Sequence, residues 1–314
     1  MISCSKQYQH FLSNPIAKPP CRMTNAKMYG FFAQIEEVKV QRFIDNTLNV
    51  AAPPHTRFEG VGEYGLITFT DIEKIASLTA PYDQHGWMQE TDIIIWLPVA
   101  KVVGQGGDES ITHLYWYPAF ICVNNIYALI NGRETWGYNK YMCDYTMPLT
   151  PSHELNFSIS MDCFKYFAPD SKLQQHELFT IVSGESDGHS LLSMLENFGE
   201  DIADLFAQKH LTIDTALLKQ LLSGFVNPQM DQILFKQFPD GKGDEAVYQA
   251  VLYSPSEIKK VHSFKLLKPD FDLTLNQLDS FPLADMFGFK IGKQPLYLPF
   301  YIEMDFDQLE ANHL

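Results

Sequence analysis

The sequence predicts an α+β protein built on an antiparallel, β-rich sheet or barrel, and three observations carry that prediction. Apolar and polar residues alternate with the period of two that a strand requires, most clearly over residues 155–162 and 296–306. Phe, Tyr and Trp make up 13% of the chain, and aromatic side chains pack well on pleated surfaces. Glycine and proline turns separate the strand-like segments, without the regular strand–helix alternation of a parallel sheet.

The elements follow in order along the chain. Residues 1–27 are polar and interrupted by prolines, which predicts an irregular arm. A helix is predicted over residues 38–48, because a Pro-Pro pair follows shortly after it. Strands are predicted at residues 28–35, 64–70, 91–99, 111–117, 126–131, 155–162, 177–183, 231–238, 246–253 and 296–306.

The segment from residue 189 to residue 224 departs from the strand pattern. Its leucines and phenylalanines recur at helical spacing with acidic residues on the other face, and Gly224 is a suitable C-terminal cap. We therefore expect residues 189–224 to form a helical hairpin, inserted into a single domain that spans residues 1–314. The pattern alone favours an oligomer contact, and hence a homo-oligomer, or a lid over a catalytic role for this hairpin.

Composition excludes several classes of function. The chain carries 23 Lys and Arg against 38 Asp and Glu, a formal charge of −15, so nucleic acid is not an expected partner. Its apolar runs are shorter than the roughly 20 residues of a membrane span, and its start lacks the pattern of a secretory signal. Five cysteines without paired spacing indicate reduced thiols in a cytoplasmic protein. No C-x-x-C or H-E-x-x-H motif occurs, so neither a metal site nor a cofactor is predicted.

Two glycine motifs have simpler interpretations than catalysis. Residues 60–65 spell G-x-G-x-x-G, but β-forming residues follow where a dinucleotide site needs a helix, which favours a turn. Residues 184–188 spell G-x-S-x-G, the pattern of a hydrolase nucleophile elbow centred on Ser186. The rest of the chain lacks the strand–helix alternation of that fold, and two acids flank the serine. A polar turn is therefore the preferred interpretation.

The segment that leads into Lys140 is more informative. Lys140 stands alone among Trp136, Tyr138, Tyr141 and Met142, directly after an apolar run. On composition alone, the lysine stem covers the aromatic residues while the ammonium stays in water. The run from Gly132 to Lys140, however, resembles the signature of the acetoacetate decarboxylase family, in which a Gly-Arg-Glu leads through a Tyr-Pro step into a Schiff-base lysine.

The resemblance covers about residues 28–170 and 226–305 and implies a barrel- or cone-like sheet with peripheral helices. It implies that Lys140 is the nucleophile and that Glu90, on an upstream strand, is the acidic residue of the site. It also implies the following substrate-binding residues: Lys27, Arg133, Glu134, Tyr138 and Tyr141. For Arg133 and Glu134, a structural ion pair that fixes the loop is an equally good interpretation.

The chain departs from the family pattern at three places. Asn139 replaces the proline before the nucleophile, and Tyr141 replaces a second lysine directly after it. The family arginine that helps to hold the substrate carboxylate has two candidate counterparts here, Arg22 and Lys27. Loss of the second lysine makes a different reaction on the same imine a real alternative.

A lysine is a nucleophile only when it is neutral. Its ordinary pKa of ~10.4 leaves roughly one molecule in 2,500 unprotonated at pH 7, and bringing it to ~6–7 takes about 5 kcal/mol. Burial among apolar and aromatic groups must supply most of that energy. A close carboxylate would oppose this lowering of the lysine pKa, so we expect Glu90 to transfer protons or to orient the reacting groups rather than to pair closely with Lys140.

Three functions follow from these residues. The first is decarboxylation of a β-keto acid through a Schiff base on Lys140. The second is an aldolase or dehydratase reaction on a 2-keto acid through the same lysine. The third is a non-catalytic β-barrel that binds an apolar carboxylate, with Lys140 as a charged anchor. A small keto acid is the expected ligand in the first two.

Overall fold

The computed structural model describes residues 8–9, 17–104, 108–151, 155–183, 229–267 and 270–314. The predicted hairpin at 189–224 and the G-x-S-x-G motif around Ser186 lie outside these residues. One extended sheet dominates the described part and is accompanied by a small three-stranded sheet. None of the helices among the described residues is long and apolar enough to cross a membrane.

The large sheet has the strand order β6-β5-β4-β3-β1-β15-β14-β9-β8-β7, with β2 paired to β4, β13 to β15 and β10 to β13. Its strands are β1 (Cys21–Gln34), β2 (Thr56–Gly60), β3 (Tyr64–Ser77), β4 (Met88–Val103), β5 (Ser110–Val123), β6 (Lys140–Met142), β7 (Asp144–Thr146), β8 (Asn156–Cys163), β9 (Gln174–Ser183), β10 (Gln229–Met230), β13 (Ser256–Leu266), β14 (Phe271–Leu275) and β15 (Gly292–Gln308). The small sheet contains β11 (Ile233–Pro239), β12 (Ala246–Tyr253) and β16 (Asn312–His313).

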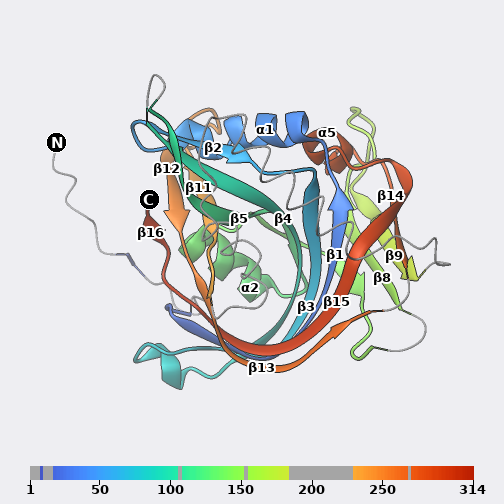
Figure 1. Cartoon of the computed structure of the whole chain (residues 1–314), viewed down its shortest axis with the longest axis horizontal. Coiled ribbons are helices and arrows are strands. Elements are labelled where there is room, and N and C mark those ends of the chain that lie inside the picture. The colour runs from blue at the N-terminus through green and yellow to red at the C-terminus, as the bar shows by residue number, and fades with distance from the viewer. Residues whose placement is uncertain (1–7, 10–16, 105–107, 152–154, 184–228, 268–269) are drawn as a thin grey trace.

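The helices are short and peripheral. They are α1 (Glu37–Asp45), α2 (Ile126–Asn131) and α5 (Leu283–Phe287), with a π-helical turn at Gly132–Trp136 and two short 3-10 turns at Leu48–Ala51 and Tyr82–Gln84. Figure 1 shows α1 beside α5 along one edge, whereas α2 lies on the concave side of the curled strands. The predicted combination of a β-rich sheet with peripheral helices is therefore confirmed.

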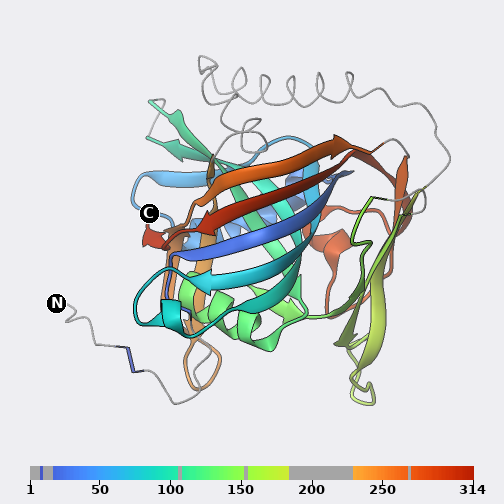
Figure 2. The same ribbon diagram turned by 90° about the horizontal axis from the view of Figure 1, so that it is seen from below.

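The sheet curls into a half-barrel and then continues into a second layer. Strands β13, β15, β1 and β3 lie side by side across the curl (Figure 2). The first part of β15 pairs with β14 and its later part with β13, so this one strand joins the curled part to the layer of β14, β9 and β8.

Aromatic residues fill the core between the half-barrel and the second layer. The ring of Phe157 on β8 lies 5.0 Å from that of Tyr29 and 5.1 Å from those of Phe31 and Phe69. These four side chains are fully buried, and each such burial stabilises the fold by roughly 1.5–3 kcal/mol. Because successive strand residues point to opposite faces, the other face of β1 is left to line the concave side.

The sheet is mixed rather than purely antiparallel. Strand β6 pairs in parallel with the end of β5, and Lys140 lies opposite Ile121. A parallel pair needs a crossover connection, which α2 and the π-helical turn supply here. The antiparallel prediction therefore fails at the strand that carries Lys140.

Two other local predictions were wrong. Residues 126–131 form helix α2 rather than a strand, because the Asn125 side chain accepts hydrogen bonds from the backbone N–H groups of Tyr127 and Ala128, at 2.9 and 3.5 Å. The predicted irregular arm ends earlier than expected, since β1 already begins at Cys21 and pairs with β3 and β15 there. The turn predicted at residues 60–65 is confirmed, with Gly62 at a φ of 70° between β2 and β3.

Candidate active site

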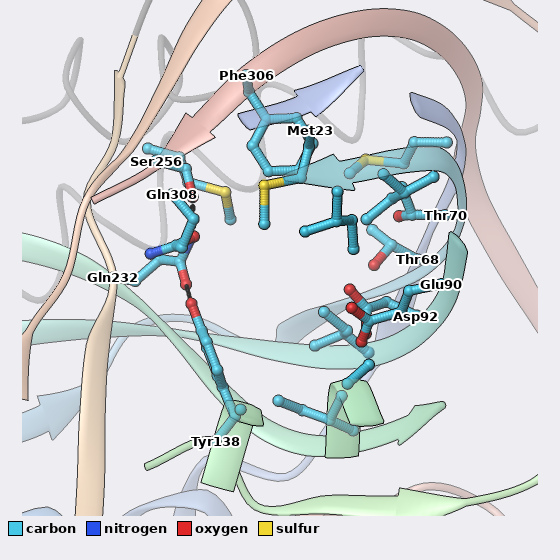
Figure 3. A pocket seen from close by; sticks show the side chains of 18 of the residues that line it. Met23, Thr68, Thr70, Glu90, Asp92, Tyr138, Gln232, Ser256, Phe306 and Gln308 are labelled. Carbon is cyan, nitrogen blue, oxygen red and sulfur yellow. Dashed lines mark hydrogen bonds between the residues drawn. The ribbon is translucent and has the colours of Figure 1, made fainter. Parts of the chain in front are cut away.

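A cavity of about 120 Å³ lies on the concave side of the curled sheet. Residues of β1, β3, β4, β13 and β15 form most of its wall (Figure 3). Residues of β5, β6, β10, α2, the π-helical turn and the loops beside them contribute the rest. The wall is mainly apolar and includes Met23, Met28, Ile72, Ile94, Phe300 and Met304. An engineered apolar cavity of roughly 150 Å³ in another protein accommodates benzene, so this one suits a ligand of similar or smaller size.

Lys140 enters this cavity from the first position of β6. The π-helical turn Gly132–Trp136 precedes it and ends at Gly137, whose φ of 90° favours glycine. The Trp136 indole N–H donates to the backbone oxygen of Leu309 at 2.8 Å, which ties this turn to the end of β15. Only 7% of the Lys140 surface is exposed, so its amine is held away from bulk water.

Gly132 allows the lysine stem to pass close to the backbone. A Cβ atom at this position would lie 2.8 Å from both Cδ and Cε of Lys140. Such a distance is well inside van der Waals contact, so any larger residue would push the lysine side chain aside. The glycine of the Gly-Arg-Glu run is therefore a packing requirement for the observed position of Lys140.

Two carboxyl groups contact the Lys140 amine. Lys140 Nζ donates a short hydrogen bond to Glu90 Oε1 and lies 3.3 Å from Asp92 Oδ1. Glu90 and Asp92 stand two residues apart on β4 and therefore point to the same face, as Figure 3 shows. The expectation that Glu90 would not pair closely with Lys140 was wrong, because β6 lies beside β5 and brings the amine within reach of β4.

The charges of this cluster determine which groups hold protons. Burial lowers the pKa of Lys140, but Asp92 and Glu90 together raise it by more, so that its pKa lies above the ordinary value. Burial and the charge of Asp92 raise the pKa of Glu90 to about 8, against the opposing effect of Lys140. The raised pKa values of Lys140 and of Glu90 both fit a charged Lys140 ammonium between two carboxyl groups that share one negative charge and one proton.

The pKa of Lys140 is therefore shifted upward, whereas burial alone would lower it. The sequence indicated an apolar and aromatic lining around the lysine but did not indicate Asp92. Asp92 could have been found because it follows Glu90 by two residues, and residues two apart on a strand point to the same face.

Uncharged polar groups form the other side of the cavity. The Tyr138 hydroxyl donates to Gln232 Oε1 at 2.7 Å, and Gln232 Nε2 donates to Ser256 Oγ at 2.5 Å. The Ser256 hydroxyl donates in turn to Gln308 Oε1 at 2.5 Å. Figure 3 shows these four residues facing Glu90 and Asp92 across the cavity. Of the four, only Tyr138 was a candidate from the sequence.

The remaining candidates do not line the cavity. Arg133 donates to Asn139 Oδ1 and to the backbone oxygen of Lys140, both at 3.1 Å. The Glu134 side chain accepts a hydrogen bond from the Tyr8 hydroxyl at 3.0 Å. Arg133 therefore fixes the loop that carries Lys140, through partners other than Glu134.

The side chain of Tyr141 leaves β6 on the face opposite that of Lys140, because strand residues alternate. Its ring stacks on Phe120 at 5.7 Å and contacts Phe281 at 5.1 Å. The position that holds a second lysine in the family pattern thus points away from the cavity in this chain.

Neither candidate for holding a substrate carboxylate reaches the cavity. Arg22 is engaged in a two-pronged ion pair with Asp307, at 2.6 and 2.8 Å. Lys27 belongs to the face of β1 that carries Tyr29, whereas Met28 lines the cavity. No group of His, Cys, Asp and Glu side chains suited to a metal ion occurs among the described residues.

The half-barrel has the fold of acetoacetate decarboxylase-like enzymes. A crystal structure of acetoacetate decarboxylase from Legionella pneumophila aligns with 99% of this chain and 93% of its own, with a TM-score of 0.60 and 11% identity. An acetoacetate decarboxylase-like enzyme from Sphingomonas wittichii aligns with 95% of this chain and 94% of its own, with a TM-score of 0.53 and 9% identity. The enduracididine biosynthesis enzyme MppR, solved in complex with pyruvate, aligns with 95% and 91%, with a TM-score of 0.51 and 10% identity.

No family model and no curated protein sequence matches this chain. At identities near one residue in ten, the likeness of the structures establishes the fold. The fold implied by the sequence resemblance is therefore confirmed, and the activity has to be argued from the cavity itself.

Proposed function

We propose that this chain is an enzyme that forms a Schiff base between Lys140 and a small carbonyl compound, and then cleaves a carbon–carbon bond next to the imine. One observation carries the proposal. Lys140 is the one basic side chain among the described residues that line the cavity, and its buried amine contacts two carboxyl groups. A buried amine beside proton-transfer groups is what imine chemistry requires.

The proton of the ammonium has an acceptor inside the cavity. When a carbonyl compound enters, Lys140 passes its proton to a neighbouring carboxylate, and the neutral amine attacks the carbonyl carbon. The carboxyl group then returns the proton to the departing hydroxyl, which leaves as water and gives an iminium. In this scheme Glu90 and Asp92 move protons, and Gly132 keeps the amine in position.

The iminium is an electron sink that supports more than one cleavage. Loss of CO2 from a β-keto acid and aldol-type cleavage both leave an enamine, which is protonated and hydrolysed to release the product. The similar structures support small carbonyl ligands, since one is an acetoacetate decarboxylase and another holds pyruvate. A non-catalytic binder is the second candidate, and the raised pKa of Lys140 favours it, because a protonated amine is not a nucleophile.

Borohydride trapping separates the two candidates. The protein is incubated with a panel of small ketones and keto acids, reduced, and analysed by peptide mass spectrometry. An imine-forming enzyme gains the mass of the reduced adduct on the peptide that contains Lys140, and a Lys140→Arg variant does not.

A matched control replaces Lys101, which does not line the cavity and whose pKa is lowered by burial, unlike that of Lys140. Lys101→Arg should label as the unmodified protein does. Labelling that is spread over exposed lysines, or that persists in Lys140→Arg, would contradict the proposal.

A further inference from the structure

The described lining of the cavity contains more acidic side chains than basic ones. Among the described residues that line it, the acidic and basic groups are the carboxyl groups of Glu90 and Asp92 and the amine of Lys140. Two further ionisable residues stay neutral, because burial raises the pKa of the Cys21 thiol to about 12 and that of the Tyr138 hydroxyl well above its ordinary value. The described lining contains no arginine, no histidine and no second lysine.

This balance leaves a substrate carboxylate without a cation of its own. Lys140 is the one cation in the described lining, and it must be neutral when it attacks the carbonyl. Once the iminium has formed, its single positive charge already faces Asp92 and Glu90. An added carboxylate would give the apolar cavity a net negative charge, and burying an uncompensated charge is strongly unfavourable.

The other side of the cavity is suited to uncharged polar groups. Gln232, Ser256 and Gln308 are each at least 93% buried and hydrogen-bond to one another. Amide and hydroxyl groups both donate and accept hydrogen bonds, so they can bind a hydroxyl or carbonyl oxygen without adding charge. They lie across the cavity from the carboxyl groups beside the lysine (Figure 3).

From this we propose that the substrate is a small uncharged β-hydroxy carbonyl compound, cleaved by a retro-aldol reaction on Lys140. The inference rests on the proposed function, since it requires the imine. It differs from the β-keto acid and 2-keto acid expected from the sequence, because the described lining provides no cation for a carboxylate.

The reaction needs only the groups that line the cavity and water. After the iminium forms, one carboxylate of the Glu90 and Asp92 pair, which both lie beside Lys140, takes the proton of the β-hydroxyl group. The bond between the α and β carbons breaks, its electron pair passes into the enamine, and an aldehyde leaves. A carboxylic acid protonates the enamine carbon, and water hydrolyses the resulting iminium to a ketone and free Lys140. The water consumed equals the water released when the imine formed.

A matched pair of ligands tests the charge preference. The β-hydroxy ketone made from acetone and acetaldehyde has the same number of non-hydrogen atoms as acetoacetate, but carries no charge. Each is incubated with the full chain at equal concentration, reduced with borohydride, and the adduct on Lys140 is quantified. We expect at least about tenfold more adduct with the hydroxy ketone, a ratio equivalent to about 1.4 kcal/mol, and release of acetaldehyde without borohydride.

A variant that adds a cation strengthens the test. Met23 also lines the cavity (Figure 3), and Met23→Lys should reduce the preference for the uncharged ligand by about tenfold. Adduct with acetoacetate alone would overturn this inference and leave the Schiff-base proposal standing. If neither ligand adds mass at Lys140, the Schiff-base proposal fails and this inference fails with it.

Discussion

Replacing Glu90 with glutamine tests the electrostatics of the cavity through the pH dependence of the free energy of unfolding, which does not depend on activity. The raised pKa of Glu90, about 8 compared with an ordinary 4.5, means that the folded protein binds a proton that the unfolded chain has already released. Each pH unit within that interval corresponds to about 1.4 kcal/mol. From pH 5 to pH 8 the free energy of unfolding should therefore fall by about 3–4 kcal/mol through this one group.

The sign follows from proton linkage. Between the two pKa values the folded state holds more protons than the unfolded state, so raising the pH favours unfolding. Glu90→Gln has no proton to lose, and its stability should fall less steeply with pH than that of the unmodified protein. Urea unfolding at a series of pH values between 5 and 8 measures both slopes.

Thr68→Val is the matched control. Thr68 lines the same cavity on β3 and is almost fully buried, but it carries no ionisable group. Its loss removes the acceptor of the Trp96 indole N–H, which should lower stability by a constant amount at every pH. Parallel curves for Glu90→Gln and the unmodified protein would refute a buried, proton-holding Glu90.

Two further predictions concern the position and the pKa of the amine. Gly132→Ala should reduce borohydride trapping on Lys140 about ten- to a hundredfold, because its Cβ would displace the lysine stem, whereas Gly241→Ala, with open space around it, should change nothing. Equal trapping in both variants would contradict this packing argument. Asp92→Asn removes a negative charge that raises the pKa of Lys140, so the pH at which trapping reaches half its maximum should fall by about 1–3 units. An unchanged pH profile of trapping would show that Asp92 does not control the pKa of Lys140.

The resemblance carried by a local run identified Lys140 and Glu90, which both line the cavity, but their close pairing was not expected. The run from Gly132 to Lys140 is continuous in the chain, and the structure keeps it together as the π-helical turn and the loop that leads into β6. Glu90 lies on a strand whose apolar pattern is strong. What sequence did not reveal is that β6 joins the sheet in parallel beside β5, which determines the distance from the amine to β4.

The polar side of the cavity could not be predicted in this way. Gln232, Ser256 and Gln308 come from separate segments and meet only because β13 pairs with β15 and residue 232 forms a bridge to Trp116 of β5. Buried amides have no characteristic spacing in sequence, unlike metal ligands. Strand alternation could have shown that Tyr141 points away from Lys140, since adjacent strand residues face opposite sides.

The crystal structure of the protein after incubation with the acetone–acetaldehyde hydroxy ketone and borohydride is the most direct test of the account. We expect continuous electron density from Lys140 Nζ into the cavity. It should fit a three-carbon group where the ketone was cleaved before reduction, or an uncleaved adduct whose hydroxyl lies near Gln232, Ser256 or Gln308. An empty cavity with the adduct on an exposed lysine would contradict the assignment of Lys140 as the nucleophile.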